Sequence, residues 1–221
     1  MIESLLISLE LALTTTMILL VIAMPLAYVL AFKSFKGRTI LEVLVALPLV
    51  LPPTVLGYYV LLMIAPHSVL GSAWANIFDS SLAFSFSGMV IASVLYSLPF
   101  AVQPMQQAFR AIPSTWLELG QVQGLTIWRS FKQIILPASK GGVLVAAALS
   151  FAHTMGEFGA VLMVGGSIPE DTKVASIALF EFVEMQQQAE AAQLALILLG
   201  VSFVMLLLVY SIQRKPWLGQ T

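Results

Sequence analysis

Two ionisable residues, His153 and Glu157, stand four positions apart inside a long apolar stretch. On one helix they would share a face, and an ionisable group at membrane depth usually marks a function or a buried pair. We therefore predict a hydrogen bond between the two side chains near the outer end of their span. Such a pair allows three roles: a structural or gating contact, a plain helix-packing contact, or a direct part in transport. The pair does not match the H-E-x-x-H pattern, so we expect no metal site.

The rest of the sequence lacks the groups that catalysis needs. It has no G-x-x-x-x-G-K-[ST] phosphate loop, no Ser/His/Asp constellation and no cysteine for a thiolate metal site. Lys and Arg number 10 against 11 Asp and Glu, and no basic patch indicates nucleic acid. We expect a protein that is not an enzyme and that binds no cofactor itself.

The elements that position His153 and Glu157 are membrane spans. The chain of 221 residues is 59% hydrophobic and only 10% charged, and a helix crosses the hydrocarbon core with about 20 apolar residues. The sequence thus predicts an all-α integral membrane protein in contact with lipid, with a single transmembrane domain over residues 1–221. Five transmembrane helices are expected, at about 5–32, 40–65, 84–109, 141–165 and 191–212.

Basic residues orient the spans, because Lys and Arg gather on the cytoplasmic side of a membrane. All but Lys173 follow the first span, separate the third from the fourth, or follow the fifth: Lys33, Lys36, Arg38, Arg110, Arg129, Lys132, Lys140, Arg214 and Lys215. We predict the N-terminus outside, the C-terminus inside and the loop 110–140 in the cytoplasm. The outer segment 167–190 is acidic, and its "VASIALFEFVEM" is expected to form a helix along the membrane surface.

Prolines interrupt the second and third spans. Pro48, Pro52 and Pro53 lie in the second, and Pro99 and Pro104 lie in the third. Each proline removes a backbone donor and kinks a helix. Two interpretations stay open: kinked packing helices, or broken helices that line a transport pathway.

The cytoplasmic stretch "LELGQVQGLTIWRSFKQIILP" mixes polar and apolar residues, unlike the spans around it. Thr115 and Glu118 have capping-box spacing, which predicts a helix start near 113–115. Gly124 suits the position just after a helix, where a left-handed backbone conformation is favourable.

A second helix is predicted after this turn. Thr126 can cap it, it is expected to run from Ile127 to Ile135, and Pro137 is expected to end it before the fourth span. One interpretation is a surface helix pair lying on the lipid headgroups. The other is a docking element for a soluble partner.

The residue spacing of the stretch favours docking, because it resembles the EAA loop of ATP-binding-cassette (ABC) import permeases, Glu-Ala-Ala-x3-Gly-x9-Ile-x-Leu-Pro. The Glu, Gly, Ile, Leu and Pro of that pattern correspond to Glu118, Gly124, Ile134, Leu136 and Pro137. Leu119 and Gly120 replace the two alanines of the family pattern. The resemblance implies a type I importer permease fold in which the loop forms a coupling helix against an ATPase subunit. Six residues are assigned to coupling on this basis: Glu118, Gly120, Gly124, Ile134, Leu136 and Pro137.

The same resemblance implies the partners. Two copies of an ATPase subunit would bind ATP and Mg. A second copy of this chain would complete the transport pathway, because five spans are too few to enclose a pathway comfortably. The location implied is the cytoplasmic (inner) membrane of a bacterium or archaeon.

Two further stretches, "MGEFGA" (155–160) and "PLVLPPTVLGY" (48–58), resemble molybdate permeases. They imply a molybdate importer, with tungstate as a co-substrate and an extracytoplasmic molybdate-binding protein as partner. Glu157 should not bind the substrate, because a carboxylate repels an oxyanion. Eight residues are assigned to the pathway or its outer gate: Pro52, Pro53, Gly57, His153, Gly156, Glu157, Phe158 and Gly159.

Two alternatives stay open. The first is a permease for sulfate, thiosulfate or another oxyanion. The second is a proton-coupled secondary transporter that uses His153 and Glu157 as a relay.

Overall fold

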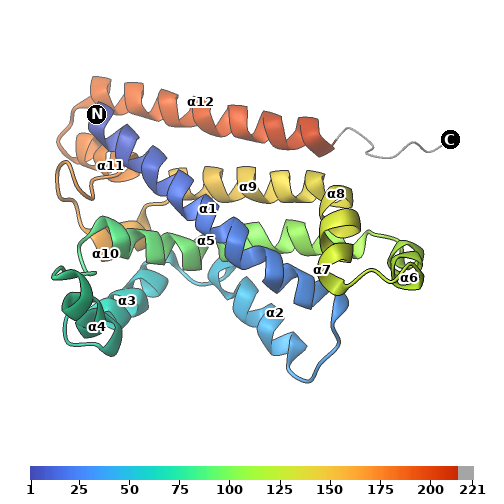
Figure 1. The fold of residues 1–221 in the computed structure, drawn as a ribbon. Coiled ribbons are helices and arrows are strands. Elements are labelled where there is room, and N and C mark those ends of the chain that lie inside the picture. The colour runs from blue at the N-terminus through green and yellow to red at the C-terminus, as the bar shows by residue number, and fades with distance from the viewer. Residues whose placement is uncertain (214–221) are drawn as a thin grey trace.

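The computed structural model describes residues 1–213, and helices dominate this part of the chain (Figure 1). Arg214 and Lys215, which entered the orientation argument, lie outside the described residues. The α-helices are α1 (Ile2–Phe32), α2 (Arg38–Ala46), α3 (Pro53–Ile64), α4 (Val69–Phe78), α5 (Phe86–Arg110), α6 (Ser114–Val122), α7 (Ile127–Ser130), α8 (Leu136–Ala138), α9 (Lys140–Met155), α10 (Gly159–Gly165), α11 (Ala175–Glu184) and α12 (Gln188–Gln213). A 3₁₀ turn, η1 (Leu47–Leu49), follows α2, and a π-helical turn, η2 (Phe131–Ile135), follows α7.

Four long helices, α1, α5, α9 and α12, form the body of the molecule (Figure 1). The helices α1, α5 and α9 pack against one another, and α12 packs on α9. Ala23 and Ala27 of α1 and Ala101 of α5 are fully buried in the largest hydrophobic cluster, where their short side chains let the helices approach. Among the described residues, the helices α1, α5 and α12 are each long and apolar enough to cross a membrane. The number of spans reaches five if two bent pairs each count as one: Arg38–Leu49 with Pro53–Ile64, and Ile127–Ala138 with Lys140–Met155.

The second predicted span is broken in two. The helical segments Arg38–Leu49 and Pro53–Ile64 meet at an angle of 111°. Pro53 is the first residue of α3, a position where the missing proline N–H would have no helical partner in any case. Pro99 and Pro104, in contrast, lie inside the continuous α5.

The fourth predicted span is also interrupted. The helix α9 ends at Met155, residues 156–158 are not helical, and α10 starts at Gly159. The short helix α10 packs on α3, so the outer halves of the two broken spans meet.

The acidic segment after α10 contains the predicted helix, α11, but this helix is part of the packed body. Ala175, Ile177 and Ala178 are buried, and the Ala175 N–H donates to Ser8 Oγ of α1 at 2.7 Å. The expectation of a helix that merely lies along the membrane surface therefore missed its buried face.

The basic residue of this segment, Lys173, forms an ion pair with Glu181 at 2.6 Å. Burial alone would raise the pKa of Glu181, but hydrogen bonds from Lys173 and Ser167 outweigh it and hold the pKa below its ordinary value. The pair neutralises part of the acidic surface.

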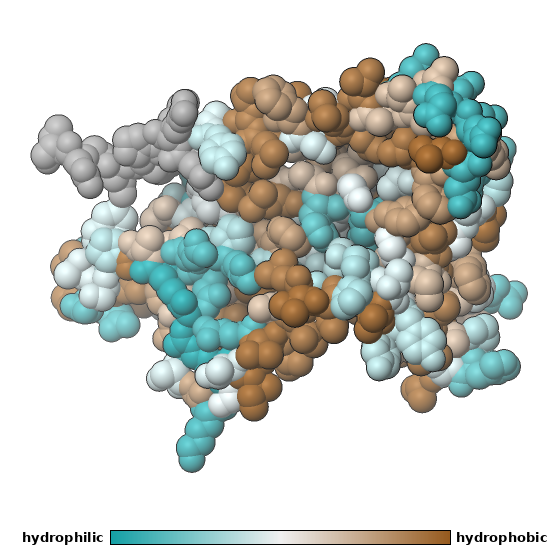
Figure 2. Space-filling view, turned by 180° about the vertical axis from the view of Figure 1, so that it is seen from behind, coloured by the Kyte–Doolittle hydropathy of each residue, from teal (hydrophilic) through white to brown (hydrophobic). Residues whose placement is uncertain are grey.

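The surface of α12 is a long apolar band (Figure 2). Figure 2 shows hydrophilic residues gathered at the end of the band where α12 begins. Leu196, Leu199 and Phe203 are each more than 60% exposed on this helix. A face of this length and composition suits hydrocarbon rather than water.

Candidate functional site

The first helix of the loop that was predicted to be cytoplasmic, α6, begins at Ser114 and has Pro113 at its N-cap position without a side-chain cap. The predicted capping box between Thr115 and Glu118 is therefore wrong. Because the helix starts before Thr115, that residue lies inside the first turn and cannot act as its cap. Glu118 is exposed on α6.

The turn at Gly124 is a Schellman motif, as its position after the helix predicted. Gly124 has φ = +73°, its N–H donates to the Gln121 carbonyl at 2.9 Å, and the Leu125 N–H donates to the Gly120 carbonyl at 2.9 Å. These two bonds satisfy carbonyls that the helix end would leave unpaired.

The second helix of the loop is capped by Thr126, whose Oγ1 accepts from the Arg129 N–H at 3.4 Å. The helix then passes through η2 and α8 and breaks at Ser139, where it turns by 72° into α9. The prediction that Pro137 ends it is wrong. Ser139 donates to the Ile135 carbonyl from both its N–H at 2.9 Å and its hydroxyl at 2.7 Å, so the helical bonding continues past the proline.

The loop is fixed to the membrane body by aromatic and apolar contacts. The Phe131 ring meets the Phe109 ring of α5 edge to face at 6.3 Å and the Tyr28 ring of α1 at 6.0 Å. Ile135 is 2% exposed within the largest hydrophobic cluster.

A pocket of about 470 Å³ opens within the loop itself, and Gly120, Ile134 and Pro137 line it. A Cβ on Gly120 would stand 2.8 Å from Ile134 Cδ1. Because that atom ends a flexible side chain, the alanine of the family pattern is also compatible with this position.

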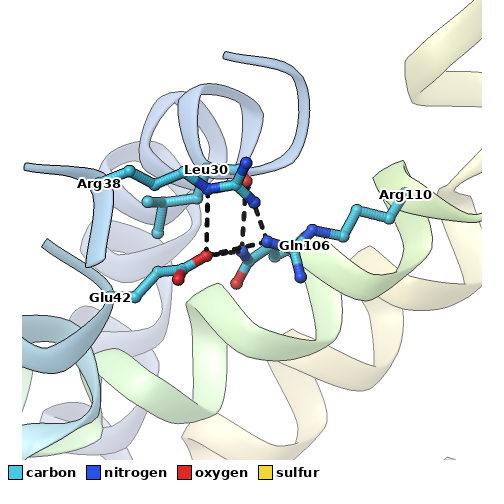
Figure 3. A network of polar contacts seen from close by, with 5 residues as sticks. All are labelled: Leu30, Arg38, Glu42, Gln106 and Arg110. Atoms are coloured by element: carbon cyan, nitrogen blue, oxygen red, sulfur yellow. Dashed lines mark hydrogen bonds and ion pairs between the residues drawn. The ribbon is translucent and has the colours of Figure 1, made fainter. Parts of the chain in front are cut away.

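A polar network joins the start of the loop to two other helices (Figure 3). Glu42 Oε1, on α2, accepts from Arg38 Nε at 3.3 Å, from Gln106 Nε2 at 3.1 Å and from Arg110 Nη2 at 2.9 Å. Gln106 and Arg110 also donate to the Leu30 carbonyl, at 3.3 Å and 3.2 Å. The network ties the ends of α1, α2 and α5 together.

At the opposite end of the molecule, α3 and α10 make a very close contact. A Cβ on Gly57 would stand 2.8 Å from Met163 Cβ and 3.0 Å from Ala160 Cα, and a Cβ on Gly159 would stand 2.9 Å from Pro53 Cβ. Glycine is required at both positions because no side-chain atom fits between the helices.

A cavity of about 610 Å³ lies beside this contact, and six of the eight predicted pathway residues line it: Pro53, His153, Gly156, Glu157, Phe158 and Gly159. Pro52 is exposed at the start of α3. Gly156 is exposed, and a Cβ there would meet nothing closer than 3.8 Å, so it is not a close-contact position.

The predicted hydrogen bond between His153 and Glu157 does not form. The helix α9 ends at Met155, so Glu157 lies beyond it and no longer shares the helical face of His153. His153 Nδ1 is instead 2.8 Å from Ser97 Oγ of α5, and its ring stacks on Phe100 with a centroid distance of 4.1 Å.

Glu157 is 4% exposed, and neither carboxylate oxygen has a hydrogen-bond partner among the described residues. The Ser93 hydroxyl lies near the carboxylate without reaching hydrogen-bond geometry, and it too lacks a partner there. The Glu157 carbonyl accepts from Ser176 Oγ at 2.5 Å, which fixes the backbone at this position.

Comparison with known proteins identifies the family of this chain. The family model described as "Binding-protein-dependent transport system inner membrane component" matches residues 9–217. The chain belongs to this family.

Curated relatives of this permease cover most of its length. It is 44% identical over 94% of its chain to the molybdenum transport system permease protein ModB of Azotobacter vinelandii, of which 92% is covered. It is 29% identical over 88% of its chain to the sulfate transport system permease protein CysT of Escherichia coli, of which 70% is covered.

Solved structures share the fold. A bacterial alginate ABC transporter, crystallised with its substrate-bound periplasmic protein, matches 96% of the permease with a TM-score of 0.76 and 18% identity, over 78% of that chain. The MetNI methionine ABC transporter in an inward-facing conformation matches 96% of both chains with a TM-score of 0.67 and 14% identity. The family match and the relative that is 44% identical make the protein a multi-pass inner-membrane permease subunit of an ABC importer, non-catalytic itself, with ATP bound by a partner ATPase.

The network around Glu42 was not among the predicted site residues. The signal was present, because Glu42 is a carboxylate inside an apolar span and such residues usually mark a function. Its partners Gln106 and Arg110 lie 64 and 68 positions away, beyond the reach of any local pattern.

Proposed function

We propose that this permease imports molybdate, with tungstate as a co-substrate. The observation that carries the proposal is the 44% identity to a molybdenum transport permease over 94% of the chain. Sulfate is the second candidate, because a sulfate permease is 29% identical over 88% of the chain.

The proposed complex contains two copies of this chain, two ATPase subunits and an extracytoplasmic molybdate-binding protein. The loop from α6 to α8 docks on the ATPase, and its pocket lined by Gly120, Ile134 and Pro137 offers an apolar contact surface. The acidic residues near α11 would repel a free dianion within a Debye length of about 8 Å. Delivery by a binding protein avoids this repulsion, and selectivity then resides in that protein.

The outer gate is proposed at the contact between α3 and α10. Gly57 and Gly159 allow the backbones of α3 and α10 to come into close contact, and His153 and Glu157 line the cavity beside this contact. Movement of α3 relative to α10 would then open the pathway during alternating access.

The test is uptake of radioactive molybdate into liposomes that contain the permease with its ATPase and enclosed ATP, with the binding protein outside. We expect uptake that needs ATP hydrolysis and that unlabelled tungstate suppresses more strongly than sulfate. Stronger suppression by sulfate would reassign the substrate. Uptake driven by a proton gradient without the ATPase would instead support the secondary-transporter alternative.

A further inference from the structure

We propose that Glu42, Gln106 and Arg110 are positioning residues that make α2 move together with the coupling loop. This inference rests on the proposed docking of the loop on the ATPase. It goes beyond that proposal because it assigns a transmitting role to residues outside the loop's own signature.

The first step is the position of Arg110. It is the last residue of α5 and stands where the loop begins. Any displacement of the loop therefore reaches this residue first. Its guanidinium reaches across to α2, where Nη2 lies 2.9 Å from Glu42 Oε1.

The second step is the anchoring of α1. Leu30 is among the last four residues of α1, whose carbonyls have no partner within the helix. Its carbonyl accepts from both Gln106 and Arg110, which also bind Glu42 (Figure 3). Two side chains of α5 therefore bridge the end of α1 and the middle of α2 at one point.

The third step is the path from α2 to the outer contact. The helix α2 leads through η1 and the break at residues 50–52 into α3. Gly57 of α3 makes the close contact with Ala160 of α10. A movement that Arg110 passes to Glu42 thus reaches the contact between α3 and α10 through one continuous stretch of chain.

The network can keep α2 and α5 aligned with each other and still let them move. The Glu42 and Arg110 side chains are 37% and 44% exposed, and exposed ion pairs break and re-form with little change in free energy. Gln106 is only 9% exposed, so the bond that it makes to Glu42 is the protected part of the network.

The first measurement needs neither the ATPase nor a substrate. The chain has no cysteine, so spin labels at Leu44→Cys on α2 and Val122→Cys on α6, both exposed, report the distance within one chain by double electron–electron resonance when the labelled chain is diluted with unlabelled wild-type chain. We expect one narrow distance in the wild type and a broader distribution in Arg110→Gln and in Glu42→Gln. An unchanged distribution in both variants would overturn the proposal.

The second measurement is uptake per ATP hydrolysed in the liposome assay. We expect Arg110→Gln and Glu42→Gln each to lower this ratio by about twofold to thirtyfold, the scale found for substitutions along a connecting network, while hydrolysis continues. The double variant should lose less than the two single losses combined, because the contact between Arg110 and Glu42 is removed in both. The matched control is Lys36→Gln, which removes an exposed charge near the network without touching it.

A broader distance with an unchanged ratio would mean that the network is only structural, and it too would overturn the positioning role. If the wild type takes up no molybdate, the proposed function fails, and the spin-label distances still decide whether the network holds α2 to the loop.

Discussion

At the end of the permease where the loop from α6 to α8 lies, one carboxylate oxygen of Glu42 accepts hydrogen bonds from three polar side chains. At the other end, Gly57 and Gly159 bring two helices together with no side chain between them. The first kind of contact is directional, partly exposed and replaceable by water. The second is steric and tolerates no added atom. A polar network can follow a moving loop, whereas a glycine contact is either closed or open.

This comparison assumes that the two ends face opposite sides of the membrane. Glu3 and Val122 are exposed at the two ends, and single cysteines at these positions test the assumption. An impermeant thiol reagent added to intact cells should label Glu3→Cys fully and Val122→Cys not at all. Labelling of Val122→Cys alone would invert the topology. Glu3 is a better site than its neighbour Ser4, which is buried.

The next largest effect is expected at the loop turn. Proline cannot adopt φ = +73° and lacks the N–H that Gly124 donates to Gln121. Gly124→Pro should therefore abolish co-purification with the ATPase while the protein still inserts. Gly124→Asn is the matched control, because asparagine accepts a left-handed conformation and nothing lies within 4 Å of the added Cβ. Equal ATPase binding by both variants would contradict the assignment of the coupling loop.

At the outer contact, a single methyl group should be enough to disturb the closed arrangement. In Gly57→Ala the new Cβ meets Met163 and Ala160, and overpacking of this kind costs about 1–3 kcal/mol. We expect reduced uptake with normal assembly on a sizing column. Gly200→Ala on α12, where a Cβ meets nothing within 4 Å, should behave like the wild type. Full uptake by Gly57→Ala would remove this contact from the gate.

Glu157 tests the comparison further, because it is a polar residue at the steric end whose carboxylate has no partner among the described residues. Glu157→Gln keeps the volume of the side chain and should retain most uptake. Glu157→Ala enlarges the cavity beside it and should lose more uptake; a lower unfolding temperature would show how much of that loss comes from packing. Uptake and thermal unfolding, measured together, separate the two effects. If Glu157→Gln is as inactive as Glu157→Ala, the carboxyl group itself takes part in transport.

The smallest effect is expected at the ion pair between Lys173 and Glu181. Lys173→Gln removes a partly exposed pair and should cost at most about 1 kcal/mol. Because the pair lowers the pKa of Glu181, its stabilisation is present above the ordinary carboxyl range and is lost as the pH falls below it. Thermal unfolding of the wild type and the variant should therefore converge in acid. A difference that grows in acid would contradict this account.

The sequence predicted those parts of the structure that local rules govern. The turn at Gly124 and the cap at Thr126 depend on residues within a few positions of each other, and both predictions are confirmed. The break in the second span is one of the two interpretations that Pro52 and Pro53 left open. The family followed from residue spacing in the loop.

Predictions failed where a helix ended unexpectedly or where distant segments met. The pairing of His153 with Glu157 assumed a continuous helix, but α9 ends at Met155. The partners found instead, Ser97 for His153 and Arg110 for Glu42, come from another helix. No spacing rule within one segment identifies such contacts, because they depend on how the helices pack.

The π-helical turn η2 adds one residue to the second helix of the loop. In this turn the Leu136 N–H bonds to the Phe131 carbonyl, five residues back, so the turn contains one residue more than an α-helical turn. With this extra residue, Phe131 faces the aromatic rings of α1 and α5 while Ile134 faces Gly120 of α6. Deleting one residue here would restore an ordinary α-helical turn and keep the flanking helix in nearly the same rotational phase, but each residue on one side of the turn would take the place of its chain neighbour. The length of a single turn therefore decides which residues of the loop face the membrane body and which face α6.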